Sequence, residues 1–441
     1  MKKALVYIIL IVIVVGGYLA YKEASKLLPF YKQLTQERVG TEKDLRAIEQ
    51  KNAYFVGAAK CLECHEENHR SWSHSRHPKM IQDPVANPSV VVADFSKLPK
   101  DANFALKDAV YTVGGKFKQR FMMRKDINGS EDYILGNYQW NVQTQKWQGF
   151  KPWKYWYKDA YPHSNEQLPT SRACDGCHFT GYMSTEQRVD VGIACESCHG
   201  PASNHIKNPK SKVYKASLSD PVRQNEVCLQ CHMRNRDKRL EDQNMSEIYG
   251  DARDYPFGYE AGKPLSEYKL VAPFVMGHET KEFYANGMGK KNRMQGNEFV
   301  HSMKGKIGIT CINCHDPHTL EPTAEKNSGN DLCMKCHSFS SPIGPHQKSL
   351  EKHTRHKADS KGSLCVECHM PKVAKHTGKS PITVRTHSFG FVTPKETLMY
   401  KMPKETNACY ACHNESSSEP RDMKTLQKDL ESWGMIGWDK R

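Results

Sequence analysis

Every cysteine of this chain lies in a C-x-x-C-H pentapeptide, and no other feature constrains the fold as strongly. The sixteen cysteines form eight such motifs, numbered 1 to 8 in chain order. Their cysteine pairs are Cys61 and Cys64, Cys174 and Cys177, Cys195 and Cys198, Cys228 and Cys231, Cys311 and Cys314, Cys333 and Cys336, Cys365 and Cys368, and Cys409 and Cys412. Their closing histidines are His65, His178, His199, His232, His315, His337, His369 and His413.

This spacing is the attachment signature of c-type haem, in which two thiols bind one porphyrin and the adjacent histidine binds its iron. A zinc site or a redox dithiol also uses C-x-x-C, but neither requires a histidine after every second cysteine. No cysteine is left over for a disulfide framework. The sequence therefore predicts eight covalently bound c-type haems, with the motif histidines as proximal iron ligands and redox chemistry as the function.

The charge of the chain has two interpretations once haem is expected. The formal net charge is +15 at pH 7, which on its own would suggest nucleic-acid binding. Each haem, however, carries two propionates, so Lys and Arg are needed as their partners. We predict charge compensation and no nucleic-acid partner, with a basic docking face for an acidic redox partner as the alternative.

The N-terminus carries an apolar run of seventeen residues, 4–20, after Met1, Lys2 and Lys3. This length is the lower limit for a membrane-spanning helix. A cleaved signal peptide is the alternative, but the exit of the run offers no good small-residue cleavage site. Residues 1–21 are therefore predicted to be a transmembrane anchor. The chain would be single-pass at the cytoplasmic membrane, with its haem body in the periplasm or extracytoplasmic space.

The rest of the chain divides by motif density and apolar spacing. Strand-like alternation and an Asn-Gly turn signal predict a small β-containing insert at about 85–160, inside a cysteine-free stretch. The expected regions are a helical stalk at 22–56, an N-terminal haem region at 57–240 with motifs 1–4 and the insert at 85–170, a linker at 241–300, a C-terminal haem region at 301–415 with motifs 5–8, and a helical tail at 416–441.

Enough histidines remain to close every haem on its distal side. The thirteen outside the motifs are His69, His74, His77, His163, His205, His278, His301, His318, His346, His353, His356, His376 and His387. Bis-histidine ligation gives a six-coordinate, low-potential haem suited to electron transfer. Sequence context favours six of them as distal ligands: His77, His205, His301, His318, His356 and His387.

Several strings resemble the multihaem cytochrome superfamily that includes octahaem hydroxylamine oxidoreductase and its small tetrahaem electron acceptor. They are GAAKCLECHEENHRSWSHSRH (57–77), VGIACESCHGPASNH (191–205), MQGNEFVHSMKGKIGITCINCHDPH (294–318), GSLCVECHMP (362–371) with RTHSFGF (385–391), and NACYACH (407–413). The resemblance implies a mainly α fold with long irregular loops organised around the eight haems. It also implies distal ligation by the six favoured histidines.

Enzymes of that superfamily leave one haem open, but two of their hallmarks are missing here. Residues 414–441 contain no tyrosine for a cross-link to the haem, and no motif ends in lysine. The sequence thus predicts an electron carrier between redox protein partners, among them a quinol-oxidising membrane complex. The alternatives are an oxidoreductase of a nitrogen or sulfur compound, or a subunit of an extracellular cytochrome filament. If one haem is open, motif 4 is the first candidate, because it corresponds in order to the catalytic haem of octahaem enzymes.

Overall fold

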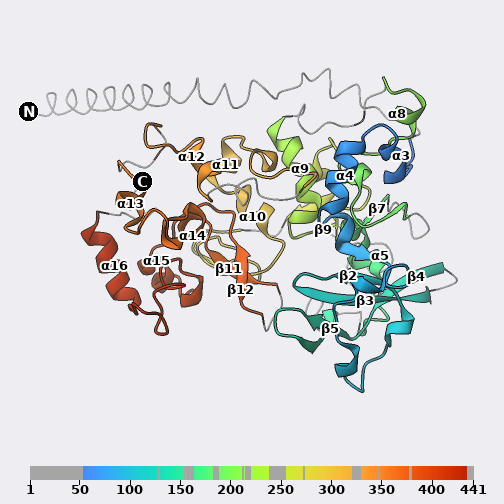
Figure 1. Cartoon of the computed structure of the whole chain (residues 1–441), viewed down its shortest axis with the longest axis horizontal. Helices are drawn as coiled ribbons and strands as arrows, with labels where there is room; N and C mark the ends of the chain where they lie inside the picture. The colour runs from blue at the N-terminus through green and yellow to red at the C-terminus, as the bar shows by residue number, and fades with distance from the viewer. Residues whose placement is uncertain are drawn as a thin grey trace, which may run out of the picture.

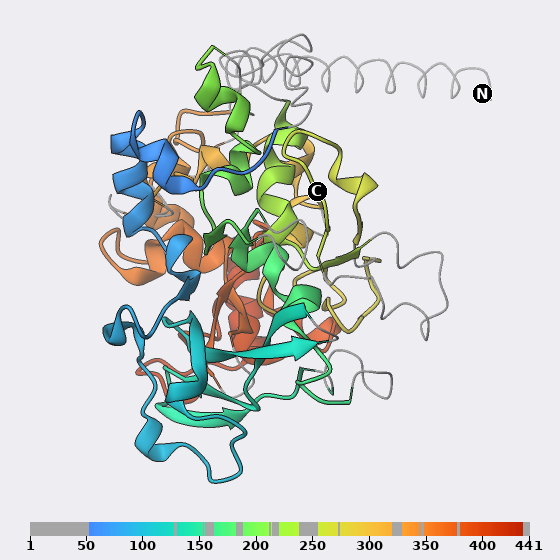
Figure 2. The same cartoon turned by 90° about the vertical axis from the view of Figure 1, so that its right-hand side faces the viewer.

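The computed structural model describes residues 53–434 with internal gaps at 128–129, 153, 155–162, 182–187, 211–212, 214–219, 238–254, 272–273, 320–328, 343, 345–347 and 377–379. An antiparallel sheet lies at one end of the molecule, and short helices and loops make up the remainder (Figures 1 and 2). The N-terminal motifs lie above the sheet, and the C-terminal motifs lie on the opposite side of the molecule in Figure 1.

The helices are short, and many of them are single turns that carry part of a motif or a histidine that faces one. They are α3 (Ala58–Leu62), α4 (Glu66–His74), α5 (Thr170–Ala173), α6 (Asp175–His178), α7 (Cys195–His199), α8 (Ser203–Lys207), α9 (Pro221–His232), α10 (Gln295–Phe299), α11 (Met303–Lys306), α12 (Asp331–Met334), α13 (Leu350–Thr354), α14 (Cys365–His369), α15 (Pro394–Met399) and α16 (Met423–Ser432). The longest, α9, begins after Asp220, whose carboxylate accepts from the amides of Val222 and Arg223, and has Pro221 in its first turn.

The main sheet has six strands in the order β1-β2-β3-β5-β6, with β4 also paired to β3. They are β1 (Ile81–Gln82), β2 (Ala109–Gly114), β3 (Lys118–Ile127), β4 (Ser130–Leu135), β5 (Tyr138–Asn141) and β6 (Lys146–Gly149). Two-stranded sheets join β7 (Phe179–Thr180) to β8 (Asp190–Val191), β9 (Asn235–Asp237) to β10 (Lys269–Val271) and β11 (Lys372–Lys375) to β12 (Ile382–Arg385). All these pairings are antiparallel.

The main sheet has a hydrophobic cluster on each face, as the period of two in a strand dictates. Phe121 of β3 packs with Phe104 and Ile134 on the outer face. The next residue, Met122, packs on the inner face with Phe179 and Tyr255, against the cysteines of motif 2. The insert is therefore part of the wall around this motif.

Two predictions about the fold are wrong. The chain is not mainly α, because a six-stranded sheet and three two-stranded sheets accompany helices of at most twelve residues. A haem motif needs only one helical turn, so the chain around it can take any conformation that covers the porphyrin. No described helix is long and apolar enough to cross a membrane. The anchor predicted at 1–21 and the stalk lie outside the described residues, apart from 53–56 at the end of the stalk.

The structure thus does not support the predicted transmembrane helix, and the single-pass localisation at the cytoplasmic membrane is corrected with it. The physical reason is the length of the apolar run. Seventeen residues are just enough to span a bilayer, so hydropathy alone could not decide the matter.

Candidate haem-binding site

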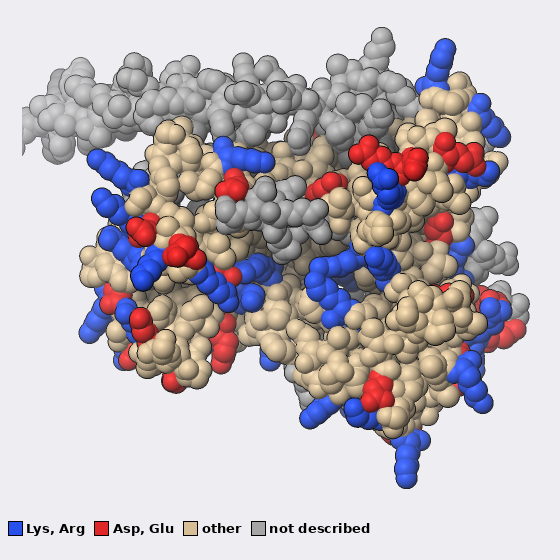
Figure 3. All heavy atoms as spheres, in the orientation of Figure 1, with Lys and Arg blue, Asp and Glu red and all other residues tan. Residues whose placement is uncertain are grey.

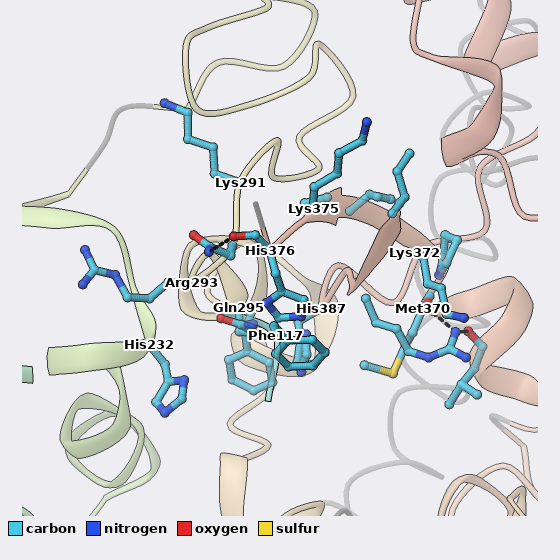
Figure 4. A pocket seen from close by; sticks show the side chains of 18 of the residues that line it. Phe117, His232, Lys291, Arg293, Gln295, Met370, Lys372, Lys375, His376 and His387 are labelled. Atoms are coloured by element: carbon cyan, nitrogen blue, oxygen red, sulfur yellow. Dashed lines mark hydrogen bonds between the residues drawn. The ribbon is translucent and has the colours of Figure 1, made fainter. Parts of the chain in front are cut away.

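The cysteine motifs surround one continuous cavity of about 5190 Å³. Cysteines of motifs 2 to 8 line it, together with motif and spare histidines, and apolar residues such as Leu364 and Phe391 complete the wall. Figure 4 shows part of this wall, with Arg293, His232, His376 and His387 around the pocket. Flat apolar cofactors with charged edges match such a lining, so the residues present fit haem.

Each motif contains a turn that places its cysteines and histidine on one side of the backbone. The histidine amide donates to the carbonyl of the first cysteine four residues earlier, at 2.8 Å from His65 to Cys61 and 2.9 Å from His413 to Cys409. This bond is the helical i to i−4 contact, which places residues four apart on one face. The local sequence is therefore enough to aim the thiols and the imidazole at the same side.

Five motif histidines face a second histidine at nearly constant distance. The ring-centroid separations are 6.3 Å for His65 and His205, 6.3 Å for His77 and His232, 6.4 Å for His315 and His387, 6.3 Å for His353 and His369, and 6.1 Å for His356 and His413. Two metal–imidazole bonds of about 2 Å and two ring radii of about 1.1 Å, from ring bonds near 1.33 Å, add up to about 6.2 Å. One iron atom fits between the rings of each pair.

Burial keeps several of these imidazoles in the neutral form that binds metal. It lowers the pKa of His77, His369 and His387 to about 4 in each case, with nearby histidines adding to the effect. Glu298 orients one of the ligands, because its carboxylate accepts from the amide of His387 at 2.6 Å. The same carboxylate also accepts from the amide of Gly289 at 2.6 Å, so His387 is tied to α10.

Four of the six favoured spare histidines lie opposite a motif histidine: His77, His205, His356 and His387. The other two do not lie opposite a motif histidine among the described contacts. The ring of His301 packs on Phe274 at 5.0 Å, and His318 lies 3.7 Å from the carboxylate of Asp316. The structure adds His353, which sequence context did not favour. Its spacing of three from His356 across the end of α13 was the available signal.

Direct contacts between motifs define which haem sites are neighbours. The side chains of Cys61 and Cys195 interact, which places motifs 1 and 3 side by side. Equivalent thiol pairs join motifs 2 and 4 (Cys177 and Cys231), motifs 4 and 5 (Cys228 and Cys311), and motifs 6 and 7 (Cys333 and Cys365). Electrostatic contacts join motifs 3 and 4, 5 and 6, and 7 and 8.

The same asparagine hydrogen bonds occur at two of these contacts between motifs. Asn225, three residues before motif 4, accepts from the amide of Cys311 in motif 5 at 2.8 Å. Asn330, three residues before motif 6, accepts from the amide of Cys365 in motif 7 at 2.8 Å. Each asparagine amide also donates to a backbone carbonyl just before the second motif. These bonds fix one motif against the next.

Comparison with known proteins agrees with haem binding by these motifs. A family model described as cytochrome c554 and c-prime matches residues 135–200, and one described as a doubled CXXCH motif matches residues 304–341. The solved structure of the outer cell wall cytochrome OcwA superposes with a TM-score of 0.65 at 25% identity, over 86% of each chain. The chain is a multihaem c-type cytochrome.

Two curated relatives of this multihaem cytochrome are more distant. It is 22% identical to the dissimilatory sulfite reductase MccA of Wolinella succinogenes, over 84% of this chain and 58% of the relative. It is 26% identical to the multihaem cytochrome MtrA of Shewanella baltica, over 36% of this chain and 46% of the relative. The cytochrome thus spans about half the length of these relatives. The narrower resemblance to hydroxylamine oxidoreductase stays an expectation from the sequence.

Motif 4 does not have the surroundings expected of an open haem in this cytochrome. Its histidine, His232, faces His77 across the spacing of an iron atom. The sequence pointed to motif 4 because of its order among the motifs, but a histidine from upstream and from another element lies opposite His232. The cysteines of motif 4 also contact motifs 2, 3 and 5, so it is a junction.

Proposed function

We propose that this chain is an octahaem cytochrome c that transfers electrons between redox protein partners. The observation that carries the proposal is the set of five histidine pairs separated by 6.1–6.4 Å. Bis-histidine haems have no free coordination position and low potentials, so their chemistry is to accept and pass on electrons. For motif histidines His199 and His337, the described contacts do not define the opposite ligand.

The contacts between motifs give the proposed order of transfer. Motifs 1, 3, 4, 5, 6, 7 and 8 form a continuous series, and motif 2 branches from it at motif 4. The ends of the series carry the two exposed motif cysteines, Cys64 and Cys412. Electrons would thus enter at one end and leave at the other, where partners such as the expected quinol-oxidising complex can approach the haem edges.

Similarity to MtrA and OcwA supports electron transfer, because both names describe cytochromes. The filament alternative has no observation in its favour. The oxidoreductase alternative does: among the described residues no ring lies opposite the histidine of motif 2, unlike those of the five paired motifs, and MccA is named as a sulfite reductase. A second function at that one haem is therefore compatible with electron transfer through the others.

Two measurements test the proposal on the mature protein. Intact mass spectrometry should show the mass of eight haems, and near-infrared magnetic circular dichroism of the ferric protein should show at least five bis-histidine haems. The bis-histidine band arises only from low-spin iron with two imidazoles. A count below five would contradict the assignment of the ring pairs, and a load below eight would remove at least one motif from it.

A further inference from the structure

The hairpin of β11 and β12 joins motif 7 to a ligand of motif 5. Strand β11 begins three residues after His369, the last residue of α14, and β12 ends two residues before His387. The two strands are antiparallel, with Lys372 opposite Arg385. The base of the hairpin therefore brings the motif histidine of motif 7 and the distal histidine of motif 5 into the same part of the molecule.

Arg385, at the base of this hairpin, binds motif 7 directly. Its Nη1 donates to the carbonyl oxygens of Val366 at 2.9 Å and Met370 at 3.0 Å, and its Nη2 donates to the carboxylate of Glu367 at 2.6 Å. Val366 and Glu367 lie between the two cysteines of motif 7, and Met370 follows its histidine. Carbonyl groups at the end of a helix lack partners within the helix, so the guanidinium supplies donors to this end of α14.

The ion pair within this contact is largely shielded from water. The exposed fraction is 27% for the side chain of Arg385 and 19% for that of Glu367. A guanidinium is a planar, pre-organised group of donors, and its bonds to a carboxylate are stronger than neutral hydrogen bonds. Met370 and His387 line the same pocket (Figure 4). Arg385 thus holds α14 against β12 at the wall of the haem cavity.

The same segment carries the distal ligand of motif 5. His387, two residues after Arg385, faces His315 at a ring-centroid distance of 6.4 Å, with 25° between the ring planes. Thr386 between them in sequence is fully buried, and its amide donates to the carbonyl of Pro371 at 3.0 Å. The backbone is therefore fixed between the guanidinium that binds motif 7 and the imidazole that faces motif 5.

Phe389 makes a second connection between the two haem sites. Its backbone φ is 57°, a left-handed conformation that a residue with a large side chain seldom adopts and that is enriched at functional sites. Its ring lies 6.0 Å from the ring of His387, and its backbone interacts with the side chain of His369. The ammonium of Lys304 lies 4.5 Å from the centroid of the Phe389 ring. One residue thus contacts ligands of both motifs.

We propose that Arg385 is a positioning residue that sets the ligand geometry of two haems at once, those of motifs 5 and 7. This proposal rests on the proposed function in requiring bis-histidine haems at both motifs. Groups that hold a metal ligand in place determine its orientation and tune the metal. The cysteine contacts connect motif 5 to motif 7 through motif 6. Arg385 would therefore link two haems that are not neighbours in the series.

Electron paramagnetic resonance of the full haem-loaded ferric chain tests the proposal. The g-values of a bis-histidine haem depend on the angle between its imidazole planes, which is 25° at motif 5 and 3° at motif 7. Arg385→Gln should therefore change the low-spin signals of these two haems and leave the others as in the wild type. The signals that disappear in His387→Ala and His353→Ala identify the two haems. A redox titration should show shifted potentials for the same two.

Two further variants separate positioning from a general loss of structure. Arg385→Lys keeps the charge but reaches fewer of the three acceptors, so both signals should move less than in Arg385→Gln. Arg421→Gln is the control, because it removes a guanidinium of similar exposed fraction, 35%, that binds Asp429 at 2.7 Å. It should leave every haem signal unchanged. If Arg385→Gln loads fewer than eight haems by intact mass, Arg385→Lys provides the same test.

Identical low-spin signals in Arg385→Gln and the wild type, with eight haems bound, would overturn the proposal. A change at motif 7 alone would also overturn it, because Arg385 would then position one haem only. Both results leave electron transfer through bis-histidine haems intact. A wild-type protein without bis-histidine signals would instead contradict the proposed function, and the role of Arg385 would fall with it.

Discussion

At the scale of single residues, the distal histidines carry the assignment of the haem sites. His353 and His356 illustrate this, because one short segment supplies both and they face the histidines of motifs 7 and 8. Two adjacent ligands can serve two haems only if those haems are neighbours. The electrostatic contact between Cys368 and Cys409 shows that they are.

Replacing His353 by alanine should convert one low-spin haem to a high-spin form. The variant removes the ring 6.3 Å from His369 and leaves the remaining pairs in place. Electron paramagnetic resonance of the ferric protein measures the change. His278→Ala is the matched control, because His278 is exposed and belongs to none of the five described histidine pairs, and its spectrum should equal that of the wild type. Identical spectra for the two variants would exclude His353 as a ligand.

A buried lysine gives a pH-dependent prediction. Burial lowers the pKa of Lys269 to about 7, and within the described part of the chain its ammonium donates to the carbonyl of Leu229 and the sulfur of Met233. A lysine pKa lower in the folded than in the unfolded protein costs stability, fully below about pH 7 and progressively less up to the unfolded value near 10.4. Lys269→Met should therefore raise the free energy of unfolding by about 2 kcal/mol at pH 6.

Thermal unfolding followed by circular dichroism at pH 6 and pH 9 checks this prediction. The gain from Lys269→Met should be clearly smaller at pH 9, where the lysine is almost entirely neutral in the folded protein but still charged in the unfolded one. An equal gain at both values would mean that packing, and not charge burial, determines the effect.

At the scale of elements, the sheet and the motif helices are joined by buried ion pairs. Arg188 binds Asp132 of β4 at 2.9 Å and Asp175 of α6 at 2.7 Å. Asp175 lies inside motif 2, and burial raises its pKa to about 6 despite the favourable effect of Arg188. This network fixes motif 2 against the sheet.

Arg188→Met should lower the free energy of unfolding by about 3 kcal/mol near neutral pH, because it leaves two buried carboxylates without their cation. The loss should shrink at pH 5. A carboxyl group whose pKa is raised in the folded protein lowers the free energy of unfolding as pH rises and the group ionises. At pH 5 the group is mostly protonated, so this cost is small. Arg124→Met is the control: it breaks an ion pair of the same sheet with Glu131, but both side chains are about half exposed, so it should cost less than about 1 kcal/mol. Equal losses would show that burial of the network is unimportant.

At the scale of the whole molecule, the haem sites form one series with a branch, wrapped by chain that has little regular structure of its own. Figure 3 shows Lys and Arg spread over the visible face, with acidic residues among them and a group of cations near its centre. This distribution favours charge compensation of haem propionates over a single basic docking face.

Because motif 4 contacts motifs 2, 3 and 5, a change at its haem should interrupt electron transfer along the series. His77→Met should raise the potential of that haem, because methionine in place of histidine favours the reduced iron. Electrons would then be held at the junction, and rapid-mixing absorption spectroscopy should resolve a slow phase for the far half of the haems. His205→Met, at the end of the series, is the control and should leave transfer between motifs 3 and 8 unchanged. A single unchanged phase in His77→Met would contradict the junction.

The sequence by itself determined the cofactor chemistry, because a thiol pair and the next histidine act within one helical turn and need no distant contact. It also predicted an insert of strands and four distal ligands that now face motif histidines, His77, His205, His356 and His387. Only the tertiary structure decided which ligand faces which motif, because the two rings of a pair come from segments separated by up to 155 residues. The same reason explains why motif 4 was the first candidate if one haem is open, although His77 lies opposite its histidine. Distance along the chain does not measure distance in space, and the segments that face each other across the haem sites are connected by no local pattern.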